Sequence, residues 1–194
     1  MRKLGVFNFM TLNGYFKGPG GDISWHQHAQ AEDPQGQKEE GEFAGNMAQM
    51  GATLLFGRVT YEMMAGYWPT PDAKKNAPQV ADGMNKSEKI VFSRTLKKVD
   101  WNNSRLVKGD LVEEVRKLKE AAGSDMCILG SGSIVTQLAE AGLIDEYMFM
   151  VDPVILGEGE PVCKGMSSKL GLKLKSTRTF KSGTILLTYE PISK

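Results

Sequence analysis

The sequence predicts an α/β protein: a mixed, mainly parallel sheet with helices on both faces and an antiparallel hairpin at the C-terminal end. Short apolar, β-rich runs alternate with helical patterns, glycines stand where strands turn into helices, and two late strand-like runs flank Lys181-Ser182-Gly183. The alternation favours parallel βαβ units, and the hairpin adds an antiparallel end. Because 194 residues contain no internal repeat or linker tract, we expect one domain over residues 1–194.

The first half of the chain predicts strand, loop, helix, strand and helix in turn. The apolar run from Leu4 to Met10 is the first strand, and the glycine-rich segment that follows it to about Trp25 is a candidate binding loop. Apolar residues at helical spacing then predict a helix over about 36–50, which a glycine ends. The buried run from Ala52 to Phe56 predicts a strand, and a second helix starts just past Gly57.

The second half continues the alternation and then ends in the hairpin. A D-x-x-E start at Asp110 predicts a helix, because the two side chains can cap each other's backbone. Another helix follows a glycine–serine turn and stops at Gly142. The remaining apolar runs predict strands at Lys89 to Phe92, Met126 to Leu129, Glu146 to Val151, Leu170 to Phe180 and Thr184 to Glu190.

Composition argues against several classes of function. The 24 basic and 23 acidic residues leave a formal charge of +1, so no global field attracts nucleic acid or anionic lipid. No apolar run is long enough for a membrane span, and the N-terminal one does not lead to a signal-peptide cleavage site. Cys127 and Cys163 are too few for a disulfide framework, and His26 and His28 lack the spacing of a zinc site. We expect a cytoplasmic protein without metal, nucleic-acid or membrane partners.

Two strand-to-helix junctions are candidate phosphate sites. In the first, Arg58 and Thr60 follow a glycine at a helix start, where free N–H groups and the helix dipole favour an anion. In the second, residues 130–134 read Gly-Ser-Gly-Ser-Ile, and glycines without Cβ atoms let the backbone approach a ligand closely. A third strand ends at Ser93-Arg94. Strand ends that face one crevice of an α/β sheet predict a nucleotide site.

The chain lacks the two commonest nucleotide-binding motifs, because no G-x-G-x-x-G follows the first strand and no G-x-x-x-x-G-K-[ST] occurs. Other short motifs run in order along nearly the whole chain: Thr11-Leu12-Asn13-Gly14-Tyr15-Phe16 with Trp25, Leu55-Phe56-Gly57-Arg58-Val59-Thr60-Tyr61-Glu62, Ser93-Arg94, Leu129-Gly130-Ser131-Gly132-Ser133, Gly142-Leu143-Ile144-Asp145-Glu146 and Pro153-Val154-Ile155-Leu156-Gly157. Together they resemble the dihydrofolate reductase-like fold, in the bacterial branch that contains the riboflavin-biosynthesis reductase (the RibD C-terminal domain type).

The resemblance implies an eight-stranded sheet that binds NADPH, a hydride delivered to a C=N bond of a ribosylamino-pyrimidine (5-amino-6-(5-phosphoribosylamino)uracil-like) or related heterocycle, and a homodimer. The implied cofactor contacts come from Gly57, Arg58, Thr60, Ser93, Arg94, Gly130, Ser131, Gly132, Ser133 and Ile134, with Ser93 and Arg94 on the 2′-phosphate. The loop from Leu12 to Trp25 would close over nicotinamide and substrate, and the implied substrate contacts come from Asn13, Tyr15, Trp25 and Phe43. A deaminase zinc motif is absent, which favours a stand-alone reductase.

The residues leave open which group supplies the proton of the reaction. Pteridine-reducing members of the family carry one buried carboxylate on the helix after the first loop. Here Glu39 and Glu42 lie on or beside the stripe formed by Phe43 and Met47, which makes them the candidate catalytic residues. Alternatively, the glutamates at this helix start stay solvated, favour the helix dipole, and leave proton supply to solvent. A dihydrofolate or pteridine reductase and a non-catalytic nucleotide-binding protein therefore stay open.

Overall fold

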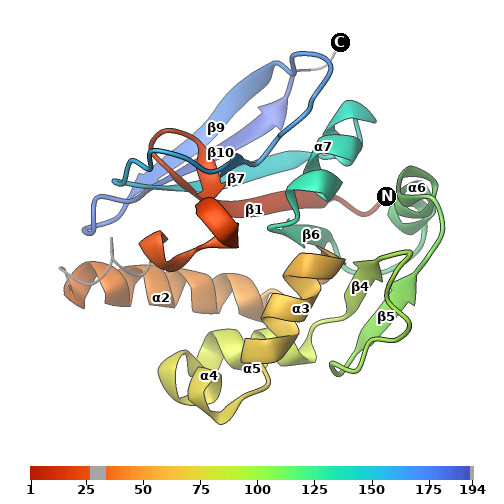
Figure 1. Ribbon diagram of the computed structural model, residues 1–194, viewed down its shortest axis with the longest axis horizontal. Helices are drawn as coiled ribbons and strands as arrows, with labels where there is room; N and C mark the ends of the chain where they lie inside the picture. The colour runs from red at the N-terminus through yellow and green to blue at the C-terminus, as the bar shows by residue number, and fades with distance from the viewer. Residues whose placement is uncertain (27–33, 193–194) are drawn as a thin grey trace.

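The computed structural model describes residues 1–26 and 34–192, which are organised around an eight-stranded sheet (Figure 1). From one edge to the other its strands are β5 (Ser104–Val107), β4 (Lys89–Phe92), β3 (Thr53–Gly57), β6 (Met126–Leu129), β1 (Leu4–Thr11), β7 (Glu146–Asp152), β10 (Ile185–Pro191) and β9 (Leu172–Thr179). Neighbours from β5 to β7 are parallel, whereas β10 is antiparallel to both β7 and β9. The predicted fold class, with its antiparallel end, is confirmed.

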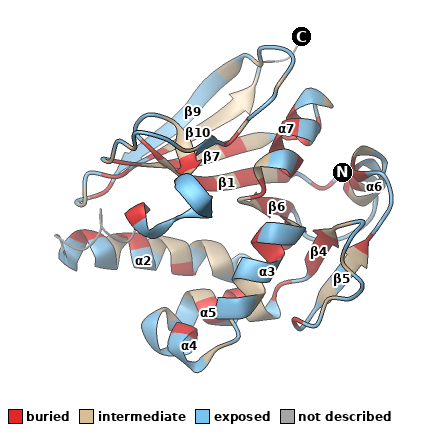
Figure 2. Cartoon of the chain, viewed as in Figure 1, coloured by how far each residue is buried: buried red, intermediate tan, exposed pale blue. Residues whose placement is uncertain are grey.

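Helices cover both faces of this sheet, and the central strands between them are largely buried (Figure 2). Successive side chains of β1 point to opposite faces, so Leu4 and Val6 lie on one and Phe7 and Phe9 on the other. The first face is covered by α6 (Leu111–Glu120) and α7 (Gly132–Glu140). The second is covered by α2 (Pro34–Gln49), α3 (Arg58–Tyr67) and α5 (Pro78–Lys86), with α4 (Pro71–Asn76) beside α5.

Helix α2 lies between the β9–β10 hairpin and α5, and glycines set both contacts. A Cβ on Gly36 would lie 2.5 Å from the backbone N of Ser182, so the first turn of α2 sits directly on the hairpin turn. Ser182 also donates its hydroxyl to the carboxylate of Glu40. At the other end, a Cβ on Gly83 of α5 would lie 2.5 Å from the carbonyl oxygen of Ala48. Side chains at these glycines would push α2 away from the hairpin turn and from α5.

The segment between β1 and Trp25 is less irregular than the sequence predicts. It contains β2 (Tyr15–Lys17), which pairs with β8 (Glu160–Pro161), and a short 3-10 helix η1 (Pro19–Gly21). The predicted D-x-x-E helix start is confirmed, because the Asp110 carboxylate accepts two N–H groups of the first turn of α6. Within the described residues, no helix combines the length and the apolarity that crossing a bilayer requires.

Candidate functional site

The candidate site lies where β1 and β6 part at the carboxyl edge of the sheet, which we call the β1–β6 fork. β1 pairs with β6 only over Leu4 to Phe7, whereas its pairing with β7 continues to Thr11. Beyond Phe7, no described strand pairs with β1 on the β6 side. In open α/β sheets, ligands bind outside the carboxyl ends of strands, where neighbouring connections diverge.

The two predicted phosphate junctions meet at this fork and are bonded to each other. The backbone N–H of Gly57 donates to Ser131 Oγ at 2.9 Å, and the backbone N–H of Ser131 donates to Thr60 Oγ1 at 3.2 Å. Both hydroxyl-bearing residues are buried. Their hydroxyls therefore join the β3–α3 turn to the β6–α7 turn, a structural task that the sequence analysis did not foresee.

Gly130 and Asn8 give the fork the character of a ligand cradle. Gly130 has φ +62°, and a Cβ there would lie 3.2 Å from Thr60 Cγ2 and 4.0 Å from Asn8 Oδ1. Asn8 is 3% exposed, and its Nδ2 has no acceptor within the described part of the chain. A buried donor without a partner destabilises the protein by about 1–3 kcal/mol, which an acceptor on a ligand would recover. A cofactor carrying amide or phosphate oxygens fits this cradle. The sequence signal for Asn8, an amide in an otherwise apolar strand, was missed.

The predicted cations stand outside the fork, at the carboxyl edge of β3 and β4. Arg58 is exposed and pairs with Glu62, one turn along α3, at 2.9 Å. Arg94 is exposed and lies two residues after the end of β4. The hydroxyl of Ser93 accepts two backbone N–H groups that follow it, and so shapes the turn that carries Arg94. Both guanidinium groups can be reached by an anionic ligand from solvent.

The start of α7 is packed tightly from two sides. A Cβ on Gly132 would lie 2.9 Å from a backbone oxygen of Val162 and 3.1 Å from Phe16 Cζ. Ile134 is buried, and its Cδ1 would be 3.5 Å from a Cβ on Gly57, whereas Ser133 is exposed. The turn therefore has a fixed shape, with one hydroxyl of the first helical turn open to solvent.

Two predicted substrate residues, Asn13 and Tyr15, hold the loop in place. Asn13 Nδ2 donates to the carbonyl oxygen of Leu156 at 2.7 Å, and its Oδ1 accepts from Thr11 Oγ1 at 2.9 Å. Tyr15, in β2, packs on Gly159, where a Cβ would lie 2.7 Å from Tyr15 Cγ. These contacts tie the loop after β1 to the segment after β7.

The other two predicted substrate residues belong to an aromatic wall on the α2 side of the sheet, formed by Phe7, Phe9, Trp25, His26, Phe43 and Phe180. Phe43 of α2 lies 6.3 Å from Phe7 between ring centroids, and the His26 ring lies 3.8 Å from Phe9. Trp25 is 5% exposed, and its Nε1 has no acceptor within the described residues. A flat heterocycle suits such a wall. His28 lies outside the described residues.

Asp152, at the end of β7, carries a buried hydrogen-bond network that spacing along the chain could not reveal. Its side chain is fully buried. His26 Nδ1 contacts Asp152 Oδ2 at 2.5 Å, and Thr184 Oγ1 donates to Oδ1 at 3.1 Å. These partners are 126 and 32 positions away. Burying a carboxylate strongly destabilises a protein unless hydrogen-bond partners satisfy it. Here His26 and Thr184 provide those partners to Asp152.

The glutamates at the start of α2 differ from one another. Glu39 accepts from the backbone N–H of Lys181 at 3.2 Å and from Arg178 at 3.1 Å, and these bonds, Lys181 first, hold the pKa of Glu39 below its usual value. Glu42 is exposed. Glu40 is 4% exposed, so the expectation that all of these glutamates stay solvated is wrong for Glu40. Its inward position follows from the direct seating of α2 on the hairpin.

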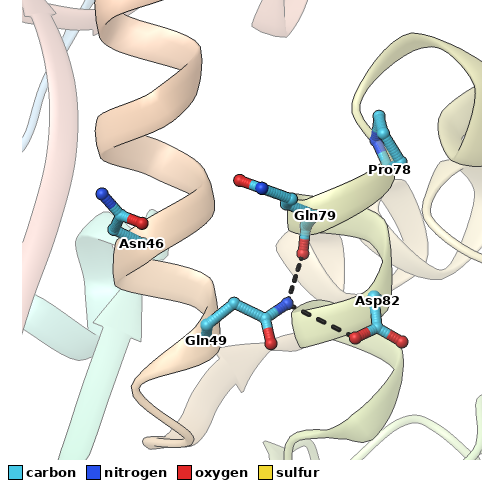
Figure 3. A pocket seen from close by; sticks show the side chains of 5 residues that line it. All are labelled: Asn46, Gln49, Pro78, Gln79 and Asp82. Atoms are coloured by element: carbon cyan, nitrogen blue, oxygen red, sulfur yellow. Dashed lines mark hydrogen bonds between the residues drawn. The ribbon is translucent and has the colours of Figure 1, made fainter.

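A separate polar hollow of about 430 Å³ lies between α2 and α5 (Figure 3). It is lined by Asn46, Gln49, Pro78, Gln79 and Asp82. Gln49 Nε2 bridges it, donating to the carbonyl oxygen of Gln79 at 2.8 Å and to Asp82 at 3.4 Å (Figure 3). The hollow adjoins the end of α2 that leads into β3, whereas the fork lies where the parallel strands end. None of the predicted site residues lines it.

Comparison with known proteins gives one family and one fold. The RibD C-terminal domain model matches residues 2–186. The uncharacterized protein YyaP of Bacillus subtilis (strain 168) is 31% identical over 180 residues, which cover 93% of this chain and 90% of YyaP.

Several solved structures share the fold. A putative riboflavin biosynthesis protein from Shewanella sp. PV-4 matches with a TM-score of 0.73 at 21% identity, over 98% of this chain and 99% of that one. Dihydrofolate reductase from Enterococcus faecalis, complexed with NADP(H), gives 0.63 at 16% identity, over 98% and 97%. The Thermotoga maritima diaminohydroxyphosphoribosylaminopyrimidine deaminase/5-amino-6-(5-phosphoribosylamino)uracil reductase gives 0.64 at 15% identity, over 98% of this chain but 57% of that longer protein. The dihydrofolate reductase-like fold is therefore confirmed.

Proposed function

The chain belongs to the RibD C-terminal domain family, and from this premise we propose that it is an NADPH-dependent reductase acting on a ribosylamino-pyrimidine or a related heterocycle. The name of the Thermotoga maritima protein includes a reductase of a ribosylamino-pyrimidine, and the Enterococcus faecalis protein binds NADP(H). When bound, the reduced nicotinamide supplies a hydride for a C=N bond.

The observation that carries the proposal is the cradle at the β1–β6 fork. Gly130 brings backbone close to any ligand there, and the buried Nδ2 of Asn8 has a hydrogen bond still to make. Arg94 and Arg58 would meet the phosphates from outside, because a guanidinium recognises phosphate oxygens bidentately. The aromatic wall, with Trp25 and Phe43, would hold the heterocycle and exclude water.

The test compares wild type with Asn8→Leu, a variant of similar volume that removes the unpartnered donor. We expect wild type to bind NADPH in a fluorescence titration and to oxidise it with a ribosylamino-pyrimidine. The variant should unfold at the same or higher urea concentration, since it buries no orphan amide, but bind NADPH about tenfold more weakly. Wild type that binds neither NADPH nor NADH would overturn the proposal.

The burial of Glu40 favours the alternative function, a dihydrofolate or pteridine reductase, because it places a buried carboxylate on α2. A substrate panel of ribosylamino-pyrimidine, dihydropteridine and simple carbonyl compounds separates the two. Turnover restricted to dihydropteridines would replace the first function with the second.

A homodimer also belongs to the proposal. β9 is the outermost strand of the sheet, and it is exposed from Lys173 to Thr179. Such an edge offers unpaired backbone N–H and C=O groups to a strand of a second copy. The charges of Lys173 and Lys175 on this strand disfavour pairing with unrelated strands. Light scattering should give twice the mass of the 21.3 kDa chain, and the monomer mass at micromolar concentration would reject the dimer.

A further inference from the structure

We propose that His26, held by the buried carboxylate of Asp152, is the proton donor of the reduction. The inference rests on the proposed function and adds a catalytic residue to it. Reduction of a C=N bond places one hydride on carbon and one proton on nitrogen. The reduced nicotinamide gives the hydride and becomes oxidised, the imidazolium of His26 gives the proton and becomes neutral imidazole, and solvent then returns a proton to it.

Asp152 is arranged to orient an imidazole. Its Oδ1 accepts from Thr184 Oγ1 at 3.1 Å, which leaves Oδ2 to meet His26 Nδ1 at 2.5 Å. An ionised carboxylate only accepts hydrogen bonds, so Nδ1 carries the proton in this contact and Nε2 faces away from Asp152. The same division of labour, with a carboxylate that fixes the tautomer and ring direction, makes histidine an effective acid or base in other enzymes. Asp152 is therefore a positioning residue.

His26 also has the surroundings that a proton donor needs. Its side chain is 21% exposed, so solvent can reprotonate it, whereas Asp152 is completely buried. The imidazole packs against Phe9 of β1. Phe9 directly follows Asn8, whose side chain lies in the fork. The side chains of Asn8 and Phe9 point to opposite faces of the sheet, so a heterocycle on the aromatic wall would meet the imidazole, and a cofactor in the cradle would reach that heterocycle through the fork, where β1 has no β6 partner beyond Phe7.

Trp25 provides an independent sign that a ligand belongs beside His26. The two rings are in contact, with centroids 5.9 Å apart. The indole is 5% exposed, yet its Nε1–H has no acceptor among the described residues. Buried indole N–H groups ordinarily have a partner, so an acceptor atom on a substrate would complete this one.

The carboxylates predicted from the sequence are poorer donors. Bonds from Lys181 N–H and Arg178 hold the pKa of Glu39 below its usual value, which keeps its carboxylate ionised and without a proton to give. Glu42 points to solvent at the helix surface. Besides Arg178, which lies over Phe43 and Phe180, His26 is the titratable group that the described structure places on the aromatic wall.

The experiment uses two substitutions of His26. His26→Gln retains an N–H donor for Asp152 but cannot deliver a proton, so the fold should survive. We expect turnover with a ribosylamino-pyrimidine to fall by ~10²–10⁴, the usual contribution of a general acid, with NADPH affinity unchanged within about twofold. In His26→Ala, added imidazole should restore turnover at least about tenfold, which a merely structural role would not allow.

Asp145 provides the matched control. Asp145 lies directly before β7, and Asp152 is the last residue of β7. The Asp145 carboxylate pairs with the buried cationic side chain of Lys119. Asp145→Asn should lower the free energy of unfolding but leave kcat of the folded protein unchanged. Asp152→Asn should lower kcat at least about tenfold with NADPH affinity intact.

A second readout needs no substrate. The chain has two histidines, so ¹⁵N-histidine NMR spectra can be assigned with the His26 variants. His26 should show a low-field Nδ1 proton that disappears in Asp152→Asn and persists in Asp145→Asn. The inference fails if that proton is absent from wild type, or if His26→Gln retains turnover within about tenfold of wild type. Wild type that does not bind NADPH overturns the proposed function instead, and this inference with it.

Discussion

The hydroxyl of Ser131 accepts the backbone N–H of Gly57 at 2.9 Å, although 74 positions separate the two residues. Ser131 has φ +57°, a left-handed conformation that residues with side chains rarely adopt. Such backbone persists only where its surroundings hold it, and here the bonds to Gly57 and Thr60 do so. The two turns that open α3 and α7 therefore form one unit, and disturbing either should disturb the proposed cofactor site as a whole.

Gly130→Val should abolish NADPH binding. The residue has φ +62°, and its new side chain would start 3.2 Å from the Thr60 methyl group, inside the cradle. Left-handed backbone at a β-branched residue also destabilises the fold by about 1–3 kcal/mol. Gly142→Val is the matched control, because Gly142 has φ +66° with nothing within 4 Å. The control should lose comparable stability in urea unfolding yet titrate NADPH normally. Equal NADPH affinity in the two folded variants would contradict the cradle.

Arg94→Ala should weaken NADPH binding far more than NADH binding. A guanidinium can pair bidentately with a 2′-phosphate, which NADH lacks, and Ser93 shapes the turn that presents it. The expected loss is about tenfold to a hundredfold for NADPH, the range of a charged hydrogen-bonded pair. Lys98→Ala is the control. Lys98 is a cation of the same loop and pairs with Asp100, so its removal should change the affinity for neither cofactor. Similar affinities of wild type for both cofactors would refute the assignment.

Glu39→Gln and Glu42→Gln should each leave turnover within about tenfold of wild type, below the ~10²–10⁴ contribution of a general acid. Glu39→Gln should instead lower stability, because the carboxylate fastens α2 to Arg178 and to the hairpin turn. Steady-state kinetics and urea unfolding measure the two effects. A thousandfold loss in either variant, with cofactor affinity intact, would return the acid to α2. The same loss in Glu40→Gln alone would favour the pteridine reductase.

The parts of the fold that the sequence predicts are those with strong hydrophobic periodicity. β1, β3, β4, β6 and β7 lie close to their predicted positions because their apolar runs are packed in the core. The closing hairpin lies close to its predicted position although β9 is exposed, because the turn at Lys181-Ser182-Gly183 marks it. β2 and β8 are too short, at three and two residues, to carry a pattern of their own. α4 and α5 each begin with a proline at the first helical position, a start signal that the sequence analysis did not use.

The site divides in the same way. Glycines at strand ends are local signals, and they correctly mark the turns that meet at the fork. Asn8 was visible only as a polar residue in an apolar strand. The Asp152 network could not be predicted, because β7 pairs with β1 and β10 and so brings His26 and Thr184 together from distant parts of the chain. Contacts made by sheet pairing leave no spacing pattern.

Lys89 makes the stability of the protein depend on pH. It lies at the start of β4, at the amino edge of the parallel strands, away from the fork. Its side chain is fully buried, and its ammonium donates to the carbonyl oxygens of Met84 and Ser87, both at 2.7 Å, and lies 4.4 Å from the centroid of the Trp101 ring. It therefore satisfies the last carbonyls of α5 where the chain turns into β4. Burial lowers the pKa of Lys89 to about 8 from 10.5.

The lowered pKa of Lys89 should make the protein more stable as pH rises from about 8 towards 10.5. In that interval the unfolded chain holds a proton that the folded chain has released, so the free energy of unfolding increases with pH. Below about 8 the lysine is charged in both states and adds no slope. Urea unfolding of wild type at pH 7.5 and 9.5, compared with Lys89→Met, should show a gain of roughly 1–2 kcal/mol that the variant lacks. Tyrosines and cysteines titrate in both proteins, so their effect cancels. Identical pH slopes would mean that the ammonium keeps its ordinary pKa in the folded state, held there by its carbonyl partners.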